Sequence, residues 1–296
     1  MNKFLERYKE LGHDIVPEEV KTVRAIRINT LKIDVQELID RMSKEGVKLT
    51  KIPFLDFGYH VDSPNFSVGA APEALQGYYY VQEAAAQIPV QVLAPKKTDL
   101  VLDMSAAPGG KTTQIAQYME NQGVLVAIDS NSSRLISLRN NIERLGVTNT
   151  IIYQKDAQFI FDFGVEFDKI LLDAPCSGNF CIDENWFNKR SIEDVKESAK
   201  MQKKLIRAAA SVLKKGGTLV YSTCSLEPEE DEFVVDWFLK EHPEMKIEET
   251  GLKAGEQGLT EALGTKLNPE LRLCRRFWPE RTKTQGFFIA KLRRIS

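Results

Sequence analysis

The strongest constraint on the fold is a regular alternation of short apolar runs with helix-length segments, which begins after residue 98. The predicted strands are residues 100–103, 123–129, 150–153, 167–172, 217–221, 245–247 and 286–292, and the predicted helices are residues 82–93, 111–121, 132–145, 192–215 and 229–241. Such alternation is typical of a mostly parallel sheet with helices on both faces. We therefore predict an α/β domain over residues 73–296.

Residues 1–72 form a separate small α+β unit in this prediction. Residues 23–29 alternate apolar and basic side chains, as a half-buried strand does, which would leave Arg24 and Arg27 facing solvent. A helix over residues 35–45 and a strand over residues 47–51 follow. This pattern suits either an accessory module whose arginines contact RNA or a purely structural cap.

The composition is that of an ordinary globular protein, with 43% hydrophobic and 28% charged residues. No apolar run reaches the ~20 residues of a membrane span, and the N-terminus lacks a signal-peptide core, so we expect a cytoplasmic protein. The net charge of −2 argues against bulk nucleic-acid binding. Residues 264–296, however, contain nine basic and two acidic side chains, a balance that suits contact with a phosphate backbone.

Two of the four cysteines directly follow predicted strands. The strand that ends at residue 172 leads into Asp173-Ala-Pro-Cys176-Ser-Gly, and the strand that ends at residue 221 leads into Ser-Thr-Cys224-Ser. Open α/β sheets bind ligands at the carboxyl ends of their strands, so both thiols are expected at one edge. No Cys-x-x-Cys pair or neighbouring histidine indicates a metal site. A buried, inert thiol remains the alternative for any single cysteine.

The first strand of the domain opens into the turn Asp103-Met-Ser-Ala-Ala-Pro-Gly-Gly-Lys-Thr. Its Gly-Lys-Thr end resembles a phosphate-binding P-loop, but Ser105 replaces the leading glycine and Pro108 removes a backbone donor. The alternative ligand is a nucleoside cofactor, which requires a carboxylate for the ribose hydroxyls after the next strand. Asp129 occupies that place, and Asp156 follows the third strand, where it could read an adenine edge.

Two thiols at one sheet edge suit covalent catalysis on a pyrimidine. Addition of a thiolate to carbon 6 makes carbon 5 nucleophilic, and loss of the carbon-5 proton after methyl transfer lets the thiolate leave. One cysteine can add to the ring while the second assists release of the product.

These motifs resemble the Sun-type (NOL/NOP/Sun) RNA 5-methylcytosine methyltransferases over about residues 80–292. The resemblance rests on the turn at 103–112, the two cysteine-bearing strand ends, Pro228-Glu229-Glu230 and the closing Gly286-Phe-Phe-Ile-Ala. The Arg-Ala-Ile-Arg-Ile-Asn-Thr stretch at 24–30 is similar to the N-terminal RNA-binding module of the family. The resemblance implies a Rossmann-like sheet of seven strands that binds S-adenosylmethionine.

The resemblance also implies a role for each site residue. Cys224 would be the nucleophile, Cys176 would assist release, and Asp173 would contact the cytosine ring beside the methyl donor. Asp129 would bind the ribose and Asp156 the adenine, with Arg134 nearby. The methionine end of the cofactor would lie against Ser105, Ala106, Ala107, Pro108, Gly109, Gly110 and Lys111.

The target is less constrained than the chemistry, because two loops depart from the family pattern. Residues 179–186 lack the Gly-x-Arg-Arg continuation of bacterial members, and Pro279-Glu280 replaces Pro-His. The compact chain, without an appended RNA-binding domain, resembles archaeal tRNA methyltransferases, so we expect it to act on tRNA, with ribosomal RNA as the alternative. A protein partner that redirects the target site is left open. The sequence carries no signal of oligomeric state, and a monomer is the default expectation. The residues expected to hold phosphates are Arg24, Arg27, Arg272, Arg275, Arg276, Arg281 and Lys283.

Two interpretations from other classes remain at this point. A P-loop NTPase would use the Gly-Lys-Thr turn, with Asp173 holding magnesium, but would leave both strand-end thiols without a role. A non-catalytic RNA-binding scaffold would keep the basic residues and likewise has no need of the thiols.

Overall fold

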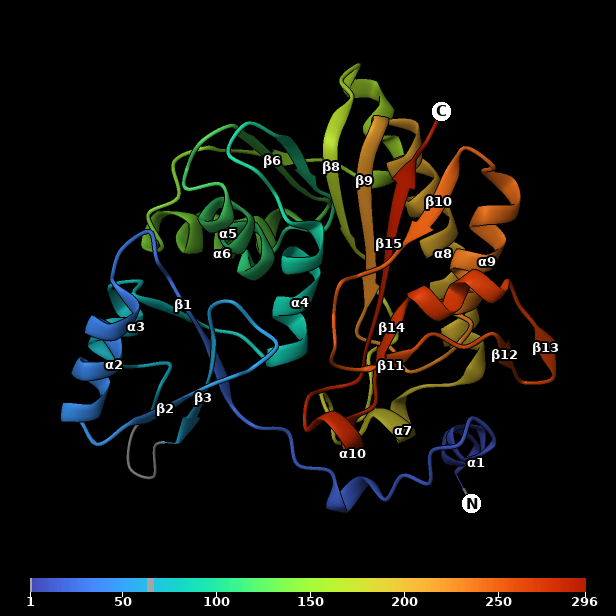
Figure 1. The fold of residues 1–296 in the computed structure, drawn as a ribbon, viewed down its shortest axis with the longest axis horizontal. Coiled ribbons are helices and arrows are strands. Elements are labelled where there is room, and N and C mark those ends of the chain that lie inside the picture. Colours follow the sequence, from blue (N-terminus) through green and yellow to red (C-terminus); the bar gives the residue numbers. More distant parts are fainter. Residues whose placement is uncertain (1, 63–66) are drawn as a thin grey trace.

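The computed structural model describes residues 2–62 and 67–296, which contain a nine-stranded sheet, a four-stranded sheet and a two-stranded hairpin, together with helices around the two larger sheets (Figure 1). Among these residues, the larger sheet has the strand order β11-β14-β15-β9-β8-β5-β6-β7, and β10 also pairs with β15. Its strands are β5 (Leu100–Asp103), β6 (Val124–Asp129), β7 (Thr150–Gln154), β8 (Phe167–Asp173), β9 (Leu213–Thr223), β10 (Met245–Glu248), β11 (Glu256–Gln257), β14 (Arg275–Phe277) and β15 (Phe287–Arg294).

The middle of this sheet is parallel, as the alternation of strands and helices predicted. Strands β7, β6, β5, β8 and β9 run parallel to one another. Beyond β9, β15 pairs antiparallel to β9, and β10 pairs antiparallel to β15. These are the seven expected strands. The short strands β14 and β11 extend the same edge, with β14 pairing to the first residues of β15.

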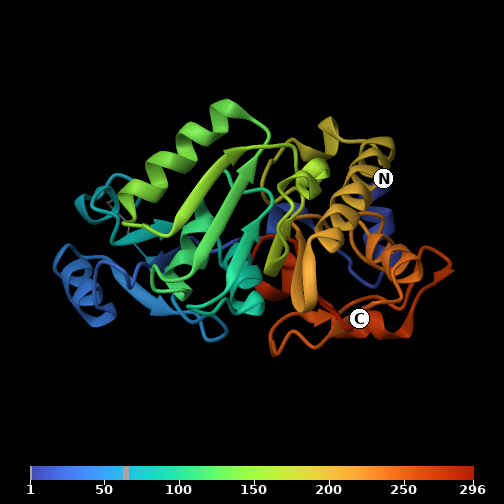
Figure 2. The same cartoon turned by 90° about the horizontal axis from the view of Figure 1, so that it is seen from above.

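Helices cover both faces of the large sheet (Figure 2). Val101 packs into a core with α4 and α5, whereas the next residue, Leu102, packs into the opposite core with α8 and α9. Side chains of successive strand residues point to opposite faces, so a strand that is apolar throughout needs cover on both sides. The helices on one face are α4 (Ala84–Leu93), α5 (Gly110–Tyr118) and α6 (Ser132–Arg144), and those on the other are α8 (Ile192–Ser211), α9 (Glu232–Glu241) and the 3-10 helix η2 (Ala157–Phe163).

The end of α8 corrects one prediction. We expected a helix to residue 215, but α8 ends at Ser211 and β9 begins at Leu213. The register between β8 and β9 shifts here: Phe167 pairs with Leu213, while Lys169, two residues on, pairs with Thr218. The chain bulges between these pairs at Gly216, whose φ of +77° favours glycine. Apolar pairing at Leu213 therefore outweighs the helix preference of the lysines that follow it.

The smaller sheet has the strand order β2-β3-β1-β4 and is antiparallel. Its strands are β1 (Ala25–Ile28), β2 (Lys48–Lys51), β3 (Gly58–Asp62) and β4 (Tyr79–Val81), and α2 (Val35–Lys44) and α3 (Pro72–Leu75) accompany it. The expected strands at 23–29 and 47–51 and the helix at 35–45 are present. Because β4 pairs with β1, this sheet takes a strand from beyond residue 72.

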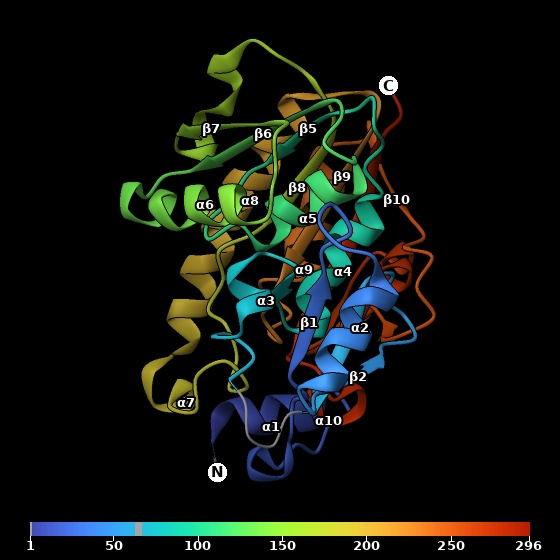
Figure 3. The same cartoon turned by 90° about the vertical axis from the view of Figure 1, so that its left-hand side faces the viewer.

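The segment before β1 packs away from the small sheet. Helix α1 (Lys3–Glu10) lies beside α7 (Trp186–Lys189) and α10 (Pro279–Thr282) in Figures 1 and 3. Phe4 and Tyr8 of α1 share an apolar cluster with Trp186 and Trp278. The remaining elements are the 3-10 helices η1 (Pro17–Glu19) and η3 (Pro269–Leu273) and the hairpin of β12 (Glu261–Ala262) and β13 (Thr265–Lys266). None of the helices in residues 2–62 and 67–296 has the length and apolar character required to cross a lipid bilayer.

Arg27 is buried, which corrects the prediction that it faces solvent and holds phosphate. All four residues of β1 are buried, because the strand lies between β3 and β4 and against α5. The Arg27 guanidinium donates to Gln82 Oε1 at 2.6 Å, Gln117 Oε1 at 3.1 Å and Thr113 Oγ1 at 2.8 Å, and also to the Gly110 carbonyl. Burial lowers the pKa of Arg27 to about 9. Arg27 thus joins the N-terminal sheet to α5, while Arg24 remains exposed.

The Arg27→Leu substitution is expected to lower the free energy of unfolding by about 2–4 kcal/mol, because it leaves buried acceptors without a donor. Chemical denaturation followed by fluorescence measures this loss. The matched control is Arg24→Leu on the exposed end of the same segment, which we expect to change stability by less than about 0.5 kcal/mol. Equal effects of the two substitutions would contradict a joining role for Arg27.

Candidate active site

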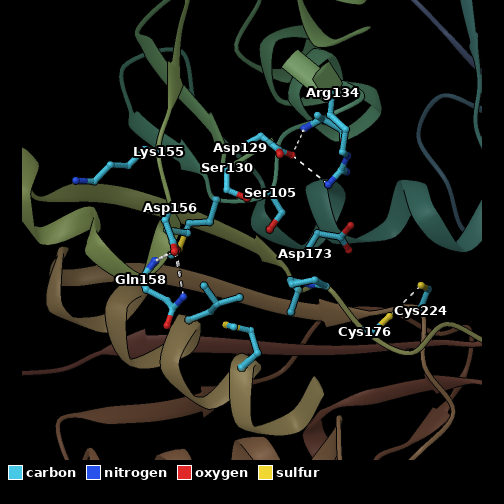
Figure 4. A pocket seen from close by; sticks show the side chains of 17 residues that line it. Ser105, Asp129, Ser130, Arg134, Lys155, Asp156, Gln158, Asp173, Cys176 and Cys224 are labelled. Atoms are coloured by element: carbon cyan, nitrogen blue, oxygen red, sulfur yellow. Dashed lines mark hydrogen bonds and ion pairs between the residues drawn. The ribbon is translucent and has the colours of Figure 1, made fainter. Parts of the chain in front are cut away.

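A cavity of about 540 Å³ lies at the carboxyl ends of the parallel strands. Eight of the predicted site residues line it: Ser105, Ala107, Asp129, Arg134, Asp156, Asp173, Cys176 and Cys224 (Figure 4). The other predicted residues of the turn after β5 do not line the cavity: Ala106, Pro108, Gly109, Gly110 and Lys111. The strand ends that the sequence singled out therefore meet at one hollow.

The turn between β5 and α5 is held from within by its own side chains. Thr112 Oγ1 donates to Asp103 Oδ2 at 2.7 Å and contacts the Ala106 carbonyl at 3.1 Å. Burial raises the pKa of Asp103 to about 6, against the opposing effect of the Thr112 hydroxyl. Gly109 has a φ of +112° and faces Leu138, so the turn requires glycine there.

The P-loop interpretation fits this geometry poorly. Thr112, which would hold magnesium in a P-loop, uses its hydroxyl on Asp103 and Ala106. The Lys111 ammonium lies 2.8 Å from Asp173 Oδ2 rather than reaching across the turn. Both polar side chains of the Gly-Lys-Thr end are thus committed to neighbouring protein groups.

Asp129 lies at the centre of one wall of the cavity. It is buried, and its two oxygens accept the backbone N–H groups of Ala107 at 3.2 Å and Asn131 at 3.0 Å. The Arg134 guanidinium lies 3.4 Å from Asp129 Oδ2 and is more than half exposed. Each Asp129 oxygen retains a further lone pair for a ligand donor.

Asp156 lies at the other end of the cavity from the thiols (Figure 4). It caps η2, with Oδ1 accepting the Gln158 N–H at 2.9 Å. The side-chain amide of Gln158 also contacts Asp156 Oδ2 at 3.1 Å. This helix-capping bond fixes the carboxylate at the cavity wall.

The two strand-end thiols are adjacent, with 3.1 Å between Cys176 Sγ and Cys224 Sγ. The Cys224 thiol, together with burial, holds the pKa of Cys176 well above its usual range. Of the other cysteines, Cys274 is in the core, and burial raises the pKa of Cys181 to about 12. Neither Cys181 nor Cys274 lines the cavity.

Asp173 lies beside the thiols and is held on both oxygens. Oδ2 is 2.8 Å from Lys111 Nζ, and Oδ1 accepts from Ser222 Oγ at 2.8 Å. Burial lowers the pKa of Lys111, but the charge of Asp173 outweighs this effect and leaves the pKa above its ordinary value. Lys111 therefore supports Asp173 from behind the cavity wall.

Part of the cavity could not be found from the sequence. Met201 and Leu205 of α8 provide an apolar wall, and Ser130, Lys155 and Gln158 complete the polar lining. The helical spacing of Met201 and Leu205 does not distinguish a pocket wall from a core contact. The only available signal was proximity: Ser130 and Gln158 follow Asp129 and Asp156 by one or two residues.

The prediction that Arg276 holds phosphate is also wrong, because this side chain is buried. It is 1% exposed, and its Nη2 lies 2.6 Å from Glu232 Oε2 and 3.0 Å from Asp231 Oδ2. A buried arginine needs such partners, and its burial keeps the guanidinium from reaching RNA. The others of this C-terminal set remain accessible, with Arg272, Arg281 and Lys283 exposed and Arg275 half-buried.

Comparison with known proteins identifies the family. The family described as 16S rRNA methyltransferase RsmB/F matches residues 90–293. The chain belongs to the RsmB/F family. The N-terminal domain of 16S rRNA methyltransferase RsmF matches residues 2–84. The resemblance drawn from the sequence motifs is thereby confirmed.

Some relatives that resemble the chain are named for tRNA, and others are named for rRNA. A tRNA (cytosine(49)-C(5))-methyltransferase of Pyrococcus abyssi is 40% identical over 99% of this chain and 96% of its own length. The 25S rRNA (cytosine-C(5))-methyltransferase nop2 of Schizosaccharomyces pombe is 40% identical over 92% of this chain. The chain spans 46% of the length of nop2 and 38% of a mouse 28S rRNA (cytosine-C(5))-methyltransferase.

Solved structures confirm the fold of this RsmB/F member. A methyltransferase homologue from Pyrococcus horikoshii superimposes with a TM-score of 0.86 at 43% identity, covering 94% of this chain and 88% of that one. NSun6 from Pyrococcus horikoshii, solved with SFG, gives a TM-score of 0.87 at 30% identity, covering 99% and 97%. The expected Rossmann-like methyltransferase sheet with an N-terminal module is therefore correct.

Proposed function

We propose that this RsmB/F member transfers a methyl group from S-adenosylmethionine to carbon 5 of cytosine in RNA. The observation that carries the proposal is the pair of thiols, 3.1 Å apart, at the edge of a cavity lined by Ser105, Asp129 and Asp156. A nucleoside cofactor explains the carboxylates of this cavity, and covalent catalysis on a pyrimidine explains the two thiols.

The lining residues fit S-adenosylmethionine. A cavity of about 540 Å³ lies within the range of cofactor sites, ~300–1,000 Å³. Asp129 would accept the ribose hydroxyls, Asp156 would receive the adenine edge between Gln158 and the apolar wall of Leu205, and Ser105 and Ala107 would face the methionine end. The bound cofactor supplies an electrophilic methyl group. Its analogue SFG in NSun6 supports this assignment.

The residues of the chain then perform the reaction on the base. The Cys224 thiolate adds to carbon 6, and Asp173, held by Lys111 and Ser222, contacts the N3 side of the ring. Carbon 5 takes the methyl group, its proton is lost, and the bond between carbon 6 and the Cys224 sulfur breaks. Cys176, adjacent to Cys224, assists this release. The target cytosine must leave its stack to reach Cys224.

We infer tRNA as the main substrate because the Pyrococcus abyssi relative, named for tRNA, matches along almost all of both chains. Relatives named for rRNA are equally similar, so rRNA is the second candidate. The exposed basic residues available to hold phosphates are Arg24, Arg272, Arg281 and Lys283. A cytoplasmic location, a monomeric state and the domain boundary near residue 72 remain predictions from the sequence.

Transfer of a labelled methyl group tests this proposal. The protein is offered unmodified bulk tRNA, ribosomal RNA and duplex DNA separately, and the products are digested to nucleosides. We expect label in 5-methylcytidine from tRNA. Label in rRNA alone would keep the chemistry and overturn the substrate, and no label despite bound cofactor would favour a non-catalytic scaffold.

A further inference from the structure

One buried carboxylate connects the two loops that carry the thiols. Glu230 is 0% exposed and does not line the cavity. Its Oε1 accepts the Ser177 N–H at 2.9 Å, and its Oε2 accepts the Ser225 hydroxyl at 2.6 Å. The Ser177 hydroxyl also donates to Oε2. Because these serines directly follow Cys176 and Cys224, a single side chain fixes both loops.

A third element reaches the same carboxylate from the helix layer. Gln202 of α8 donates to Glu230 Oε1 at 3.0 Å and contacts the Pro175 carbonyl at 3.0 Å. Four donors therefore surround Glu230, and all of them are neutral. In the described ranges 2–62 and 67–296, no cation forms a salt bridge with it. The carboxylate is thus committed to the loops rather than to an ion pair.

The Glu230 charge also acts on one of the two sulfurs. Together with the effects of the Cys224 thiol and of burial, the Glu230 carboxylate raises the pKa of Cys176. A negative charge disfavours a neighbouring thiolate, so loss of the Glu230 charge is expected to lower the pKa of Cys176.

We propose that Glu230 is a positioning residue that holds the Cys176 and Cys224 loops together and so keeps the two thiols adjacent. The inference rests on the proposed function of Cys224 as the nucleophile. Glu230 acts through Ser177 and Ser225 and touches neither the base nor the cofactor.

Glu230→Gln tests this inference, because glutamine keeps the size but loses the charge and one acceptor. We expect kcat for methyl transfer to fall about 10-fold to 100-fold, since small displacements of reacting groups are costly. The dissociation constant for S-adenosylmethionine is expected to change less than about twofold, because Glu230 is outside the cavity. Glu229→Gln is the matched control: Glu229 is the adjacent residue but binds Arg7, at 2.6 Å.

The pH dependence of thiol alkylation distinguishes the proposed role of Glu230 from a purely structural one. The rate of iodoacetamide modification at Cys176 is measured by peptide mass spectrometry over a range of pH. This rate increases with pH, and we expect the increase to begin at a lower pH in Glu230→Gln than in the wild type. This measurement needs neither RNA nor methyl transfer, so it tests Glu230 even if no RNA is methylated. Unchanged kcat and an unchanged Cys176 profile would overturn the proposal, as would equal losses of turnover and cofactor binding.

Ser177→Ala and Ser225→Ala keep the proposal testable if Glu230→Gln fails to fold. Each removes a serine hydroxyl that donates to Oε2 and leaves the carboxylate in place. We expect each to lower kcat with little change in cofactor affinity, and the double substitution to cost less than the sum of the two, because both act through one carboxylate. Full activity in both single variants would contradict the role of Glu230.

Discussion

The Cys224→Ala variant is expected to lose methyl transfer by at least about 10⁴-fold, since no other group replaces a nucleophile that bonds to the base. Cys224 follows β9 and lines the cavity at the thiol pair. Its removal leaves the cofactor-binding carboxylates untouched, so S-adenosylmethionine affinity is expected to remain within about twofold of the wild type. The measurement is label transfer to RNA, paired with calorimetric titration of the cofactor. Residual turnover near the wild-type rate would exclude Cys224 as the nucleophile.

The Cys176→Ala variant is expected to accumulate a covalent complex between the enzyme and RNA. The Cys224 bond to carbon 6 still forms, but its breakage lacks the thiol that lies 3.1 Å away. Denaturing electrophoresis after incubation with RNA and S-adenosylmethionine detects the complex as a slowly migrating band. Cys181→Ala is the matched control, because Cys181 lies outside the cavity and is expected to give no band. If the band appears in Cys224→Ala instead, the roles of the two thiols are reversed.

The parts of the fold that the sequence predicted well are those in which apolar pattern and local signals agree. Each strand of the parallel sheet contains an apolar run that ends at a polar residue, so β6 and β8 were located together with their site aspartates, Asp129 and Asp173. The strands that escaped prediction are short or polar, such as β11 and β14. Strand β14 pairs with the edge of β15, and β11 pairs with β14 in turn. These edges are a property of the folded sheet rather than of the local sequence.

The prediction of phosphate-binding residues failed at Arg27 and Arg276 for a different reason. Alternation places Arg27 on the polar face of its strand, but it does not reveal whether that face meets water or another element. In the structure the face of Arg27 meets Gln82, Gln117 and Thr113. Arg276 was likewise taken for a surface cation because its acidic partners precede it by more than forty residues. Pairings between distant segments decide both cases.

Because β15 lies near the end of the sequence, its pairing with β9 is a late step in the folding of the newly made protein. Residues 288–293 pair with residues 218–223 of β9, immediately before Cys224. The Asn179 side chain further ties the Cys224 carbonyl, at 2.8 Å, to the Gly286 carbonyl. A ribosome completes β9 and both thiol loops several seconds before it completes β15. A nascent chain can thus carry both strand-end thiols while the sheet edge beside Cys224 is still open.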